Sequence, residues 1–357
     1  MTSRERVAAV LAGEVPDRVP LDSGYWQTTV DRWRREGLPE SVSPSDYFGT
    51  NEIARMGGDY TMQFPVRIVE EKEDLRTYWD RNGALVRDLH TDHGWTSQWL
   101  DYTIKTDADW RRHRDRLQFN ATRISESALA NWRKVRAAGK ACLYQAHACF
   151  HPTWSRIGMI EEMVLMKEEP GLIRDMFSAQ TQLVIDIFEG MQKLGIEFDG
   201  AYIADDLGYV AGPLISPAMY RELVLPYHKR VCMHLADHGL KAILHSDGNV
   251  GPLIPLFLEA GFSGLNPLEA KANLDVRELK PQYGDRLILH GNIDVRKLAG
   301  TRAEIEQEIA SKIPIAMQGG GYIYACDHSV PNDISFENYC FAMELVKHHS
   351  SYRSTRV

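Results

Sequence analysis

From about residue 140 onward, short apolar runs alternate with longer stretches in which apolar residues recur every three or four positions. Apolar runs of four to eight residues are typical of buried strands, and the wider spacing is typical of amphipathic helices. The strands predicted here are ACLYQA (141–146), FDGAYIA (198–204), KAILHS (241–246), FSGLNP (262–267), RLILHG (286–291) and YIYAC (322–326). RVPLD (18–22) is an earlier run of the same type.

The predicted helices lie between these strands, at residues 169–195, 216–239, 251–261, 301–313 and 335–349. Several of them begin near Ser, Thr or Pro and end at Gly, as helix termini commonly do. The opening residues, MTSRERVAAVLAGEVPDRVP, predict a further short helix.

Strict alternation of strand and helix predicts parallel βαβ units. Seven strands are visible, and an eighth hidden in the N-terminal half would close them into a barrel. An open doubly wound sheet would be favoured by a GxGxxG run after the first strand, and the sequence has none. The glycines at 319–321 precede their strand, which indicates a turn. The predicted fold class is therefore α/β, a TIM-type (β/α)8 barrel with an elaborated N-terminal region.

Residues 25–135 differ in composition from the rest of the chain. They are rich in Trp, Arg and Asp, with short alternating stretches such as QFPVRIVEE and ALVRDLHT. The sequence has no internal repeat, and no low-complexity linker separates these residues from the later ones. We therefore predict one barrel domain over residues 1–357, with an elaboration of small strands and helices at roughly 25–135.

The composition, 44% hydrophobic and 25% charged, is ordinary for a globular enzyme. The net charge of -8 and the lack of a dominant Lys/Arg cluster argue against nucleic-acid binding. The sequence has no run of about 18 apolar residues and no signal-peptide core, so we expect no membrane span and a cytoplasmic protein. The five cysteines are odd in number and have no CxxC spacing, which argues against a disulfide framework and against a zinc ribbon.

Polar residues gather at the C-terminal ends of the predicted strands, where barrels of this type carry their chemistry. They are Asp205 and Asp206 after GAYIA, His245 and Asp247 after KAIL, Asn266 and Glu269 after FSGL, His290 and Asn292 after LIL, and Cys326, Asp327 and His328 after YIYA. Five successive strands therefore end in ligand-type groups on the face that would become a pocket.

His245 and Asp247 lie two residues apart, and hence on the same side of the pleat. Zinc accepts imidazole, thiolate and carboxylate ligands, and a catalytic zinc keeps one position open. We therefore predict a zinc site with His245 and Cys326, completed by Asp247 or Glu269. Two plainer interpretations stay open: residues 247–249 could form a simple turn, and Cys326 could be a small buried hydrophobe.

Five stretches carry a family resemblance: DRVPLDSGYW, AYIADDLGYVAGPLISPAMYRELVLPYHKR, LHSDGNVGPLIPLFLEAGFSGLNPLE, LILHGNID and GGGYIYACDHSVPNDISFENY. In this order they resemble the uroporphyrinogen decarboxylase superfamily and, within it, the methyltransferase-like branch. The resemblance covers nearly the whole chain. It implies a TIM-type barrel with its site at the C-terminal mouth.

The superfamily contains two chemistries, so the fold alone does not choose between them. Its decarboxylases use no metal or cofactor, and an N-terminal run similar to RQAGRY meets the carboxylates of a tetrapyrrole. The equivalent region here reads LDSGYWQTTVDRW, and the arginines Arg32, Arg34 and Arg35 resemble the outer face of a helix. The decarboxylase interpretation therefore lacks its usual anchor.

The other branch exchanges methyl groups between a small molecule and the cobalt of a separate corrinoid protein. Members that act on thiols bind zinc through a His-x-Cys pair and a distant cysteine. His245 and Cys326 match the histidine and the distant cysteine, whereas Asp247 stands in place of the first cysteine. An oxygen ligand leaves zinc a harder Lewis acid. The resemblance therefore favours O-demethylation of a small substrate, above all a methoxylated aromatic, over methylation of a thiol.

The resemblance also suggests roles for further residues. Asp205, Asp206 and His328 are candidates to position the substrate or deliver a proton, although either aspartate could instead cap its strand end. Aromatic residues could line the substrate pocket or belong to the core, and Asn292 is a further candidate for substrate binding. The aromatic candidates are Tyr25, Trp26, Trp95, Trp99, Tyr202 and Tyr209.

The sequence has no DxHxxG run, the motif with which corrinoid proteins ligate cobalt. We therefore expect the corrinoid on a partner protein that docks over the mouth, with the N-terminal elaboration as one candidate docking surface. A homodimer stays open. The alternatives to O-demethylation are a metal-free decarboxylase, a methylcobamide:thiol methyltransferase and a barrel that binds a small molecule without turnover.

Overall fold

Seven parallel strands form one sheet, and their order in the sheet follows their order along the chain. The computed structural model describes residues 1–91 and 94–352, without the side chains of residues 94 and 95. The strands are β1 (Ile53–Met56), β6 (Ala141–His147), β7 (Gly200–Ala204), β10 (Ala242–His245), β11 (Gly264–Asn266), β12 (Ile288–His290) and β13 (Tyr322–Ile323). All six strands predicted beyond residue 140 are confirmed, and β1 is the strand that the sequence had hidden.

Residues 18–22, the earlier predicted strand, form isolated β-bridges instead of a regular strand, and they lie between the two edges of the sheet. The Asp22 N–H donates to the Tyr324 carbonyl at 2.9 Å, next to β13. On the other side, the Glu52 N–H donates to the Leu21 carbonyl at 3.4 Å, next to β1. This segment therefore takes the eighth position of the ring, and the TIM-type (β/α)8 prediction is confirmed.

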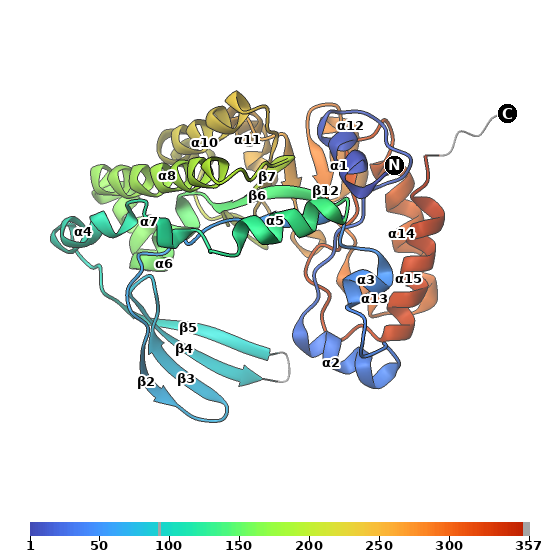
Figure 1. Cartoon of the computed structure of the whole chain (residues 1–357), viewed down its shortest axis with the longest axis horizontal. Helices are drawn as coiled ribbons and strands as arrows, with labels where there is room; N and C mark the ends of the chain where they lie inside the picture. The colour runs from blue at the N-terminus through green and yellow to red at the C-terminus, as the bar shows by residue number, and fades with distance from the viewer. Residues whose placement is uncertain (92–93, 353–357) are drawn as a thin grey trace.

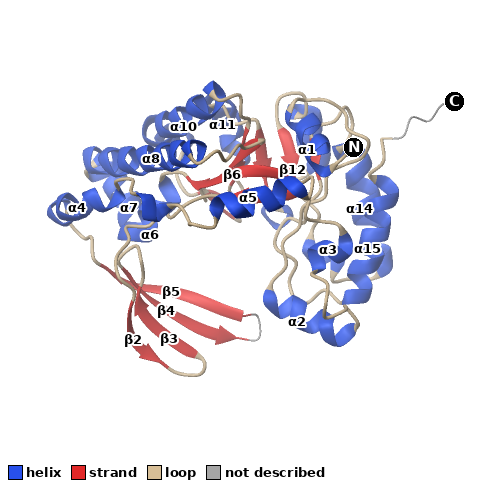
Figure 2. Cartoon of the chain, in the orientation of Figure 1, coloured by secondary structure: helices blue, strands red, loops and turns tan. Residues whose placement is uncertain are grey.

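Helices cover the outside of the barrel, as Figures 1 and 2 show. Between β6 and β7 lie α6 (Phe150–Ile157), α7 (Met159–Glu168) and α8 (Pro170–Lys193), and between β7 and β10 lie α9 (Pro217–Met219), a π-helical stretch (Tyr220–Val224) and α10 (Leu225–Asp237). The later helices are α11 (Ile254–Ala260), α12 (Val276–Tyr283), α13 (Val295–Leu298), α14 (Arg302–Ala316) and α15 (Phe336–His349). Short 3-10 turns precede α11 and α12, at Gly251–Leu253 and Ala270–Ala272.

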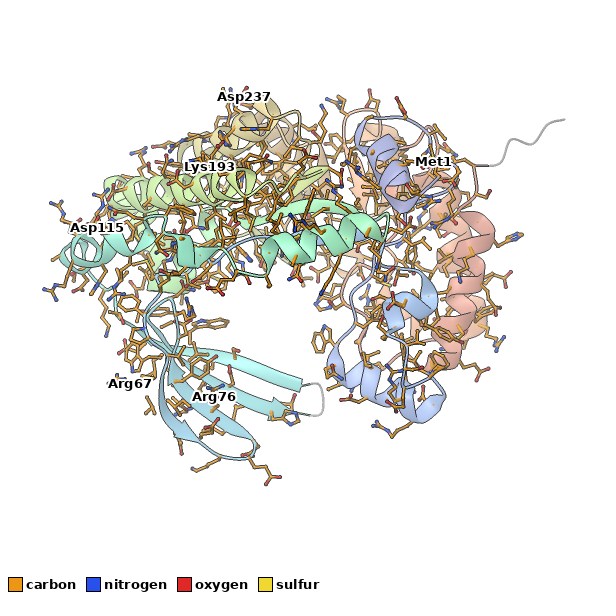
Figure 3. The ribbon with its side chains drawn as sticks, viewed as in Figure 1. Met1, Arg67, Arg76, Asp115, Lys193 and Asp237 are labelled. Carbon is orange, nitrogen blue, oxygen red and sulfur yellow. The ribbon has the colours of Figure 1, made fainter. Side chains whose placement is uncertain are left out.

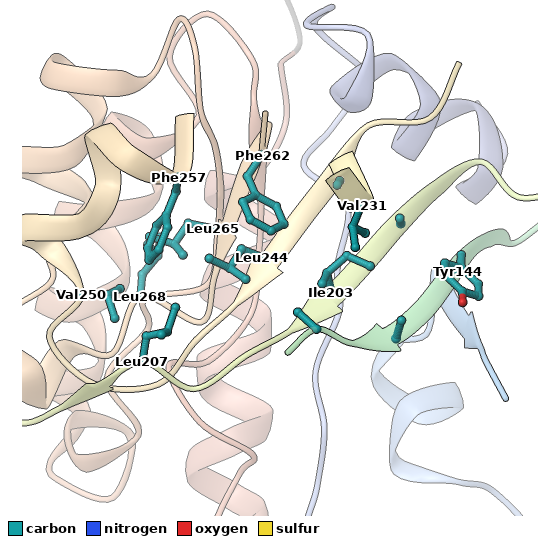
Figure 4. Close-up of a cluster of buried hydrophobic side chains, with 14 of the residues drawn as sticks. Tyr144, Ile203, Leu207, Val231, Leu244, Val250, Phe257, Phe262, Leu265 and Leu268 are labelled. Carbon is teal, nitrogen blue, oxygen red and sulfur yellow. The ribbon is translucent and has the colours of Figure 1, made fainter. Parts of the chain in front are cut away.

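Alternate residues of each strand face outward, toward these helices, or inward, toward the barrel axis. Outward residues pack against the helices in the large core, where Figure 4 shows Ile203 and Leu244 among side chains such as Val231 and Phe257. Inward residues form a second apolar cluster, which includes Ile53, Leu143, Tyr202, Ile243, Ile288 and Ile323. Helix α1 (Ser3–Leu11) adds Val7, Val10 and Leu11 to this cluster and so covers the lower end of the barrel.

The N-terminal elaboration contains α2 (Gln27–Glu36), α3 (Pro44–Phe48) and a four-stranded antiparallel sheet. The strands of that sheet are β2 (Arg67–Glu71), β3 (Leu75–Trp79), β4 (Ala84–Thr91) and β5 (Gly94–Tyr102), and Figure 1 shows them extending away from the barrel. The chain returns through α4 (Asp107–His113), turns at Arg114–Leu117 and Ala121–Arg123, and α5 (Ala128–Ala137). The barrel strand β1 therefore lies inside the 25–135 region.

Two smaller features bear on the predictions. Gly319, Gly320 and Gly321 all have positive φ angles just before β13, which confirms that they form a turn. Among the helices of the described ranges 1–91 and 94–352, none combines the length and the apolar character needed to cross a membrane.

Candidate functional site

The inward-facing side chains change from apolar to polar toward the C-terminal ends of the strands. Two residues beyond Ile53, Ile243 and Ile288 stand Arg55, His245 and His290, which face the same side because side chains alternate along a strand. The neighbouring strands contribute Gln145 and Asn266, and Asn266 pairs with His245 in register. Tyr202, which pairs with Ile243 one step lower, reaches the same cavity with its side chain. The mouth is therefore a polar layer above a buried apolar layer.

This polar layer lines a cavity of about 450 Å³. Its walls are completed by His147 and Ala204, the last residues of β6 and β7, and by groups from the connecting segments, namely Asp22, Ser23, Gly24, Asp247, Pro267, Ala325, Cys326, His328 and Ser329. A second cavity of about 470 Å³ adjoins it and shares Gln145 and His147 with it. Both volumes are in the range of small-molecule sites.

Asp206, His245 and Asp247 converge at this mouth, with one donor atom from each lying within 4.8 Å of the others. The His245 Nε2 atom is 3.9 Å from Asp206 Oδ1 and 3.8 Å from Asp247 Oδ1. Zinc bonds of 2.0–2.2 Å at tetrahedral angles separate ligand atoms by about 3.4 Å. Small side-chain rotations would therefore bring these three donors onto one divalent cation.

The hydrogen bonds of His245 leave its Nε2 atom free to act as a ligand. Asn266 donates through Nδ2 to the His290 carbonyl at 3.1 Å, which fixes its Oδ1 atom as an acceptor. His245 Nδ1 lies 2.7 Å from this Oδ1 atom and must carry the proton of the neutral ring. Tyr202 also donates to the same oxygen, at 2.5 Å. The Nε2 lone pair therefore faces Asp206 and Asp247, as a metal-binding histidine requires.

The two carboxylates of the cluster differ in their electrostatics. Burial alone would raise the pKa of Asp206, but His151, whose Nδ1 lies 2.8 Å from Asp206 Oδ2, outweighs burial and lowers it. Burial raises the pKa of Asp247, against the influence of His245, and the charges of Asp206 and Glu269 raise it further. Negative charge is therefore in excess around Asp247, which favours a cation there.

A charged triad lies beside this cluster. The Arg55 guanidinium pairs with Asp22 and lies 4.3 Å from the centroid of the Tyr202 ring. The His290 Nε2 atom is 3.0 Å from Asp22 Oδ2. Burial would raise the pKa of Asp22, but Arg55 and His290 outweigh it and hold this pKa below its usual value. The charge of Arg55 is therefore already matched by Asp22.

The structure separates the four predicted metal ligands into two groups. His245 and Asp247 lie together, as their spacing predicted, and Asp206 joins them. Cys326 lines the same cavity, but its Sγ atom contacts the Tyr324 hydroxyl at 3.9 Å and is not part of the three-donor cluster. Glu269 is also outside the cluster. It accepts from the Gly248 N–H at 2.8 Å and pairs with Lys271 at 2.6 Å.

Asp205 faces away from the cavity, because it lies one position beyond Ala204, which lines the cavity, and side chains alternate along the strand. It is fully buried and accepts from the N–H groups of Phe150 and His151 at 3.1 and 2.6 Å. Its Oδ2 atom is also 2.8 Å from His228 Nε2. Asp205 therefore acts as a cap, as one of the two earlier interpretations proposed. It caps the start of helix α6, however, and not the end of its own strand.

Asn292 is likewise buried among backbone groups. Its amide donates to the carbonyls of Leu268 and Leu274, both at 2.6 Å, and accepts from the Val276 N–H at 3.0 Å. Through these contacts the Asn292 side chain joins its own loop to the segment of residues 268–276. Asn292 does not line the cavity.

The predicted aromatic residues are distributed unevenly. Tyr202 and the candidate His328 line the cavity, and the Trp26 ring lies 5.6 Å from the His328 ring. Tyr25 bonds through its hydroxyl to Thr50 Oγ1 at 2.7 Å and belongs to the core. Trp99 (41% exposed) and Tyr209 (54% exposed) lie at the surface, outside the cavity. The Trp95 side chain lies outside the described part of the structure.

Sequence reasoning missed several polar residues of the mouth, among them Asp22, Arg55, His147 and His151. His147 and His151 follow the predicted strand ACLYQA in the run HACFH, so the strand-end rule applied to that strand would have found them. Asp22 ends the predicted strand RVPLD and was open to the same rule. Arg55 carried no such signal, because its strand, IARM, has only four residues and Arg55 itself interrupts the apolar run.

Comparison with known proteins places this chain beside one family. A family model for uroporphyrinogen decarboxylase (URO-D) matches residues 158–349. The uroporphyrinogen decarboxylases of Pseudoalteromonas translucida and Xanthomonas euvesicatoria are 27% identical over 189 residues and 26% identical over 188 residues. These alignments cover 51% and 50% of this chain. They cover 49% and 50% of the two relatives, so the chain spans about half the length of the curated relatives it matches.

A solved structure, a methyltransferase from Methanosarcina mazei, is similar over almost the entire chain. It aligns with 98% of this chain and 99% of its own, with a TM-score of 0.68 and 17% sequence identity. At this identity the similarity establishes a shared fold. It includes the barrel strands that lie before the segment matched by the family model.

Proposed function

Because this chain belongs to the uroporphyrinogen decarboxylase family, which includes more than one chemistry on one barrel, we propose that it is a metal-dependent methyltransferase. Its substrate would be a small methylated compound, and the methyl acceptor would be the corrinoid of a separate protein. The observation that carries the proposal is the cluster of Asp206, His245 and Asp247 at the barrel mouth. Its donor set, one imidazole and two carboxylates, suits zinc or a similar divalent ion.

The charge of the mouth also supports this choice over a tetrapyrrole substrate. Among the described residues that line the 450 Å³ cavity, Arg55 is the only lysine or arginine, and it is paired with Asp22. Asp206 and Asp247 add negative charge that repels a substrate with several carboxylates. The same charge attracts a divalent cation. A neutral or weakly charged methylated molecule is therefore the better fit.

The nature of the ligands bears on which bond is broken. Two oxygen donors make a bound cation a hard Lewis acid, which would polarise the oxygen that gives up its methyl group. A phenolate is a better leaving group than an alkoxide, so a methoxylated aromatic is the substrate class that we propose. The cavity volume of about 450 Å³ accommodates one such ring with its substituents.

The surrounding residues would keep this cluster in order. Tyr202 and Asn266 hold His245 in the tautomer with a free Nε2 atom. His151 holds the Asp206 carboxylate from its other side. Neighbours of this kind fix the orientation of metal ligands, and their removal commonly lowers metal affinity about 10- to 100-fold. His328, on the cavity wall, would meet the substrate.

Two measurements test the proposal in sequence. Protein purified without chelator should contain one divalent ion at the mouth, and His245→Ala or Asp206→Asn should lose it. Methyl transfer from a panel of methoxylated aromatics to reduced cobalamin should then depend on the same residues. His348→Ala, an exposed substitution on α15, is the matched control and should retain both properties. An enzyme that transfers methyl groups equally well in His245→Ala would refute the role of the cluster.

Uroporphyrinogen-type decarboxylation is the second candidate, and the family match over residues 158–349 favours it. It predicts turnover of a porphyrinogen by metal-free protein, with no effect of chelators. Decarboxylation that persists after metal removal would support this candidate and exclude the first.

A further inference from the structure

We propose a second metal site on the outside of the barrel, formed by Glu189 of α8 together with His234 and His238 at the end of α10. One donor atom of each side chain lies within 4.8 Å of the others. The ligand would be a divalent transition-metal ion of the zinc type. This site shares no residue with the mouth, so it is independent of the proposed function.

The spacing along the chain produces half of this arrangement. His234 and His238 are four residues apart, so the helix places their side chains one above the other on a single face. Glu189 faces them from the adjacent helix α8. Its Oε1 atom is 3.0 Å from His234 Nε2 and 3.2 Å from His238 Nε2.

These distances are close to those of an assembled site. In a tetrahedral zinc site, neighbouring ligand atoms lie about 3.4 Å apart. One carboxylate oxygen therefore already lies near the required distance from both imidazole nitrogens. Little movement of the backbone or side chains would be needed to admit an ion.

The orientation of His234 adds an independent observation. Its Nε2 atom is shielded from solvent and has no hydrogen-bond partner among the described residues, although Glu189 Oε1 lies only 3.0 Å away. The ring nitrogen is therefore not directed along the line to that oxygen. Ligands of a common ion point toward the ion and not toward one another, and a buried nitrogen without a partner is costly unless something binds it.

Packing holds the two rings in place. Phe188, which is fully buried, contacts both imidazoles edge to face, with ring centroids 5.6 Å from His234 and 4.9 Å from His238. The three proposed ligands remain 25–36% exposed at their side chains, so an ion can reach them from solvent. The cluster is thus both ordered and accessible.

The location indicates a structural role. Figure 3 labels Lys193 and Asp237, the last residues of α8 and α10, whose chains continue to the lower ends of β7 and β10. This end is opposite the catalytic mouth, where barrel residues serve stability. The negative ends of two helix dipoles meet there and favour a cation. A bound ion would tie the two helices together.

The test uses the full-length protein in a His245→Ala background, which removes the mouth cluster. Zinc titration followed by metal analysis should give one ion per chain, with a raised thermal midpoint. Replacing both histidines of the outer site, with His234→Gln and His238→Gln, should abolish the binding and the rise in midpoint. Glu189→Gln should weaken the apparent affinity at least ten-fold.

Two controls keep the outcome interpretable. The variants without metal should have the same circular dichroism and thermal midpoint as their parent. Replacing His348 and His349, a neighbouring pair on α15 whose rings are 4.9 Å apart, should leave zinc binding unchanged. Failure of the His245→Ala parent to bind zinc would overturn the proposal, as would unchanged binding in the double variant. Loss of methyl transfer alone would concern only the mouth.

Discussion

Asp205→Asn should destabilise the protein without acting on the substrate directly. The carboxylate of Asp205 lies behind the mouth and accepts four hydrogen bonds, three from backbone N–H groups at the start of α6 and one from His228. The substitution preserves shape and volume, so its effect comes from charge and hydrogen bonding alone.

The contacts indicate how large the effect should be. The Oδ2 atom accepts from the N–H groups of Cys149 and Phe150 and from the His228 ring. The Oδ1 atom accepts only from the His151 N–H, at 2.6 Å. The asparagine oxygen would occupy the Oδ2 position, and its NH₂ group would then oppose that N–H. An unsatisfied buried donor costs about 1–3 kcal/mol, and the remaining bonds lose their charge assistance. We expect a total loss of about 2–4 kcal/mol in the free energy of unfolding.

Urea unfolding followed by circular dichroism at pH 7 measures this loss. The control is Asp285→Asn, because the Asp285 side chain is 82% exposed and its substitution should change stability by less than about 0.5 kcal/mol. If Asp205→Asn left stability unchanged but abolished activity, Asp205 would be a catalytic group and its assignment as a cap would be wrong.

Three further predictions concern single positions. Asp22→Asn should cost about 2 kcal/mol at pH 7 because it removes a buried ion pair. Since the pKa of Asp22 is lowered, the difference from wild type in urea unfolding should persist above a pH of about 4 and shrink only as the pH falls below it; a difference confined to neutral pH would contradict this. Gly248→Ala should cost at least about 2 kcal/mol in the same assay, because φ is +81° and the new Cβ atom would lie 2.3 Å from the Gly208 backbone; unchanged stability would contradict the turn geometry. Burial raises the pKa of Cys326 to about 12, so in metal-free native protein at pH 8 mass spectrometry should find it alkylated more slowly than Cys340; faster labelling would contradict its burial.

Most of the barrel could be predicted from sequence because its strands are buried on both faces. Such strands are nearly continuous apolar runs, as in KAIL and LIL, and their alternation with helices specifies parallel pairing. Strand β1 escaped prediction because it is short and places Arg55 inside the mouth. A polar residue required by the site there interrupted the pattern that identifies a strand.

The candidate site could be predicted only where the strand geometry continues. His245 and Asp247 were correctly paired by alternation, and the same rule, counted from the inward Tyr202, would have separated Asp206 from Asp205. The rule fails beyond a strand end where the backbone changes direction. Asn292 follows Gly291, and both have positive φ angles, so its amide turns into the loops instead of the cavity.

The most direct test of the central claim is the anaerobic absorbance assay of methyl transfer to cob(I)alamin, run with zinc-loaded protein and a panel of methoxylated aromatics. We predict formation of methylcobalamin with at least one compound, dependence on the divalent ion, and a loss of at least 100-fold in His245→Ala. Rates that are equal with and without the ion and with and without His245 would contradict a metal-dependent methyltransferase.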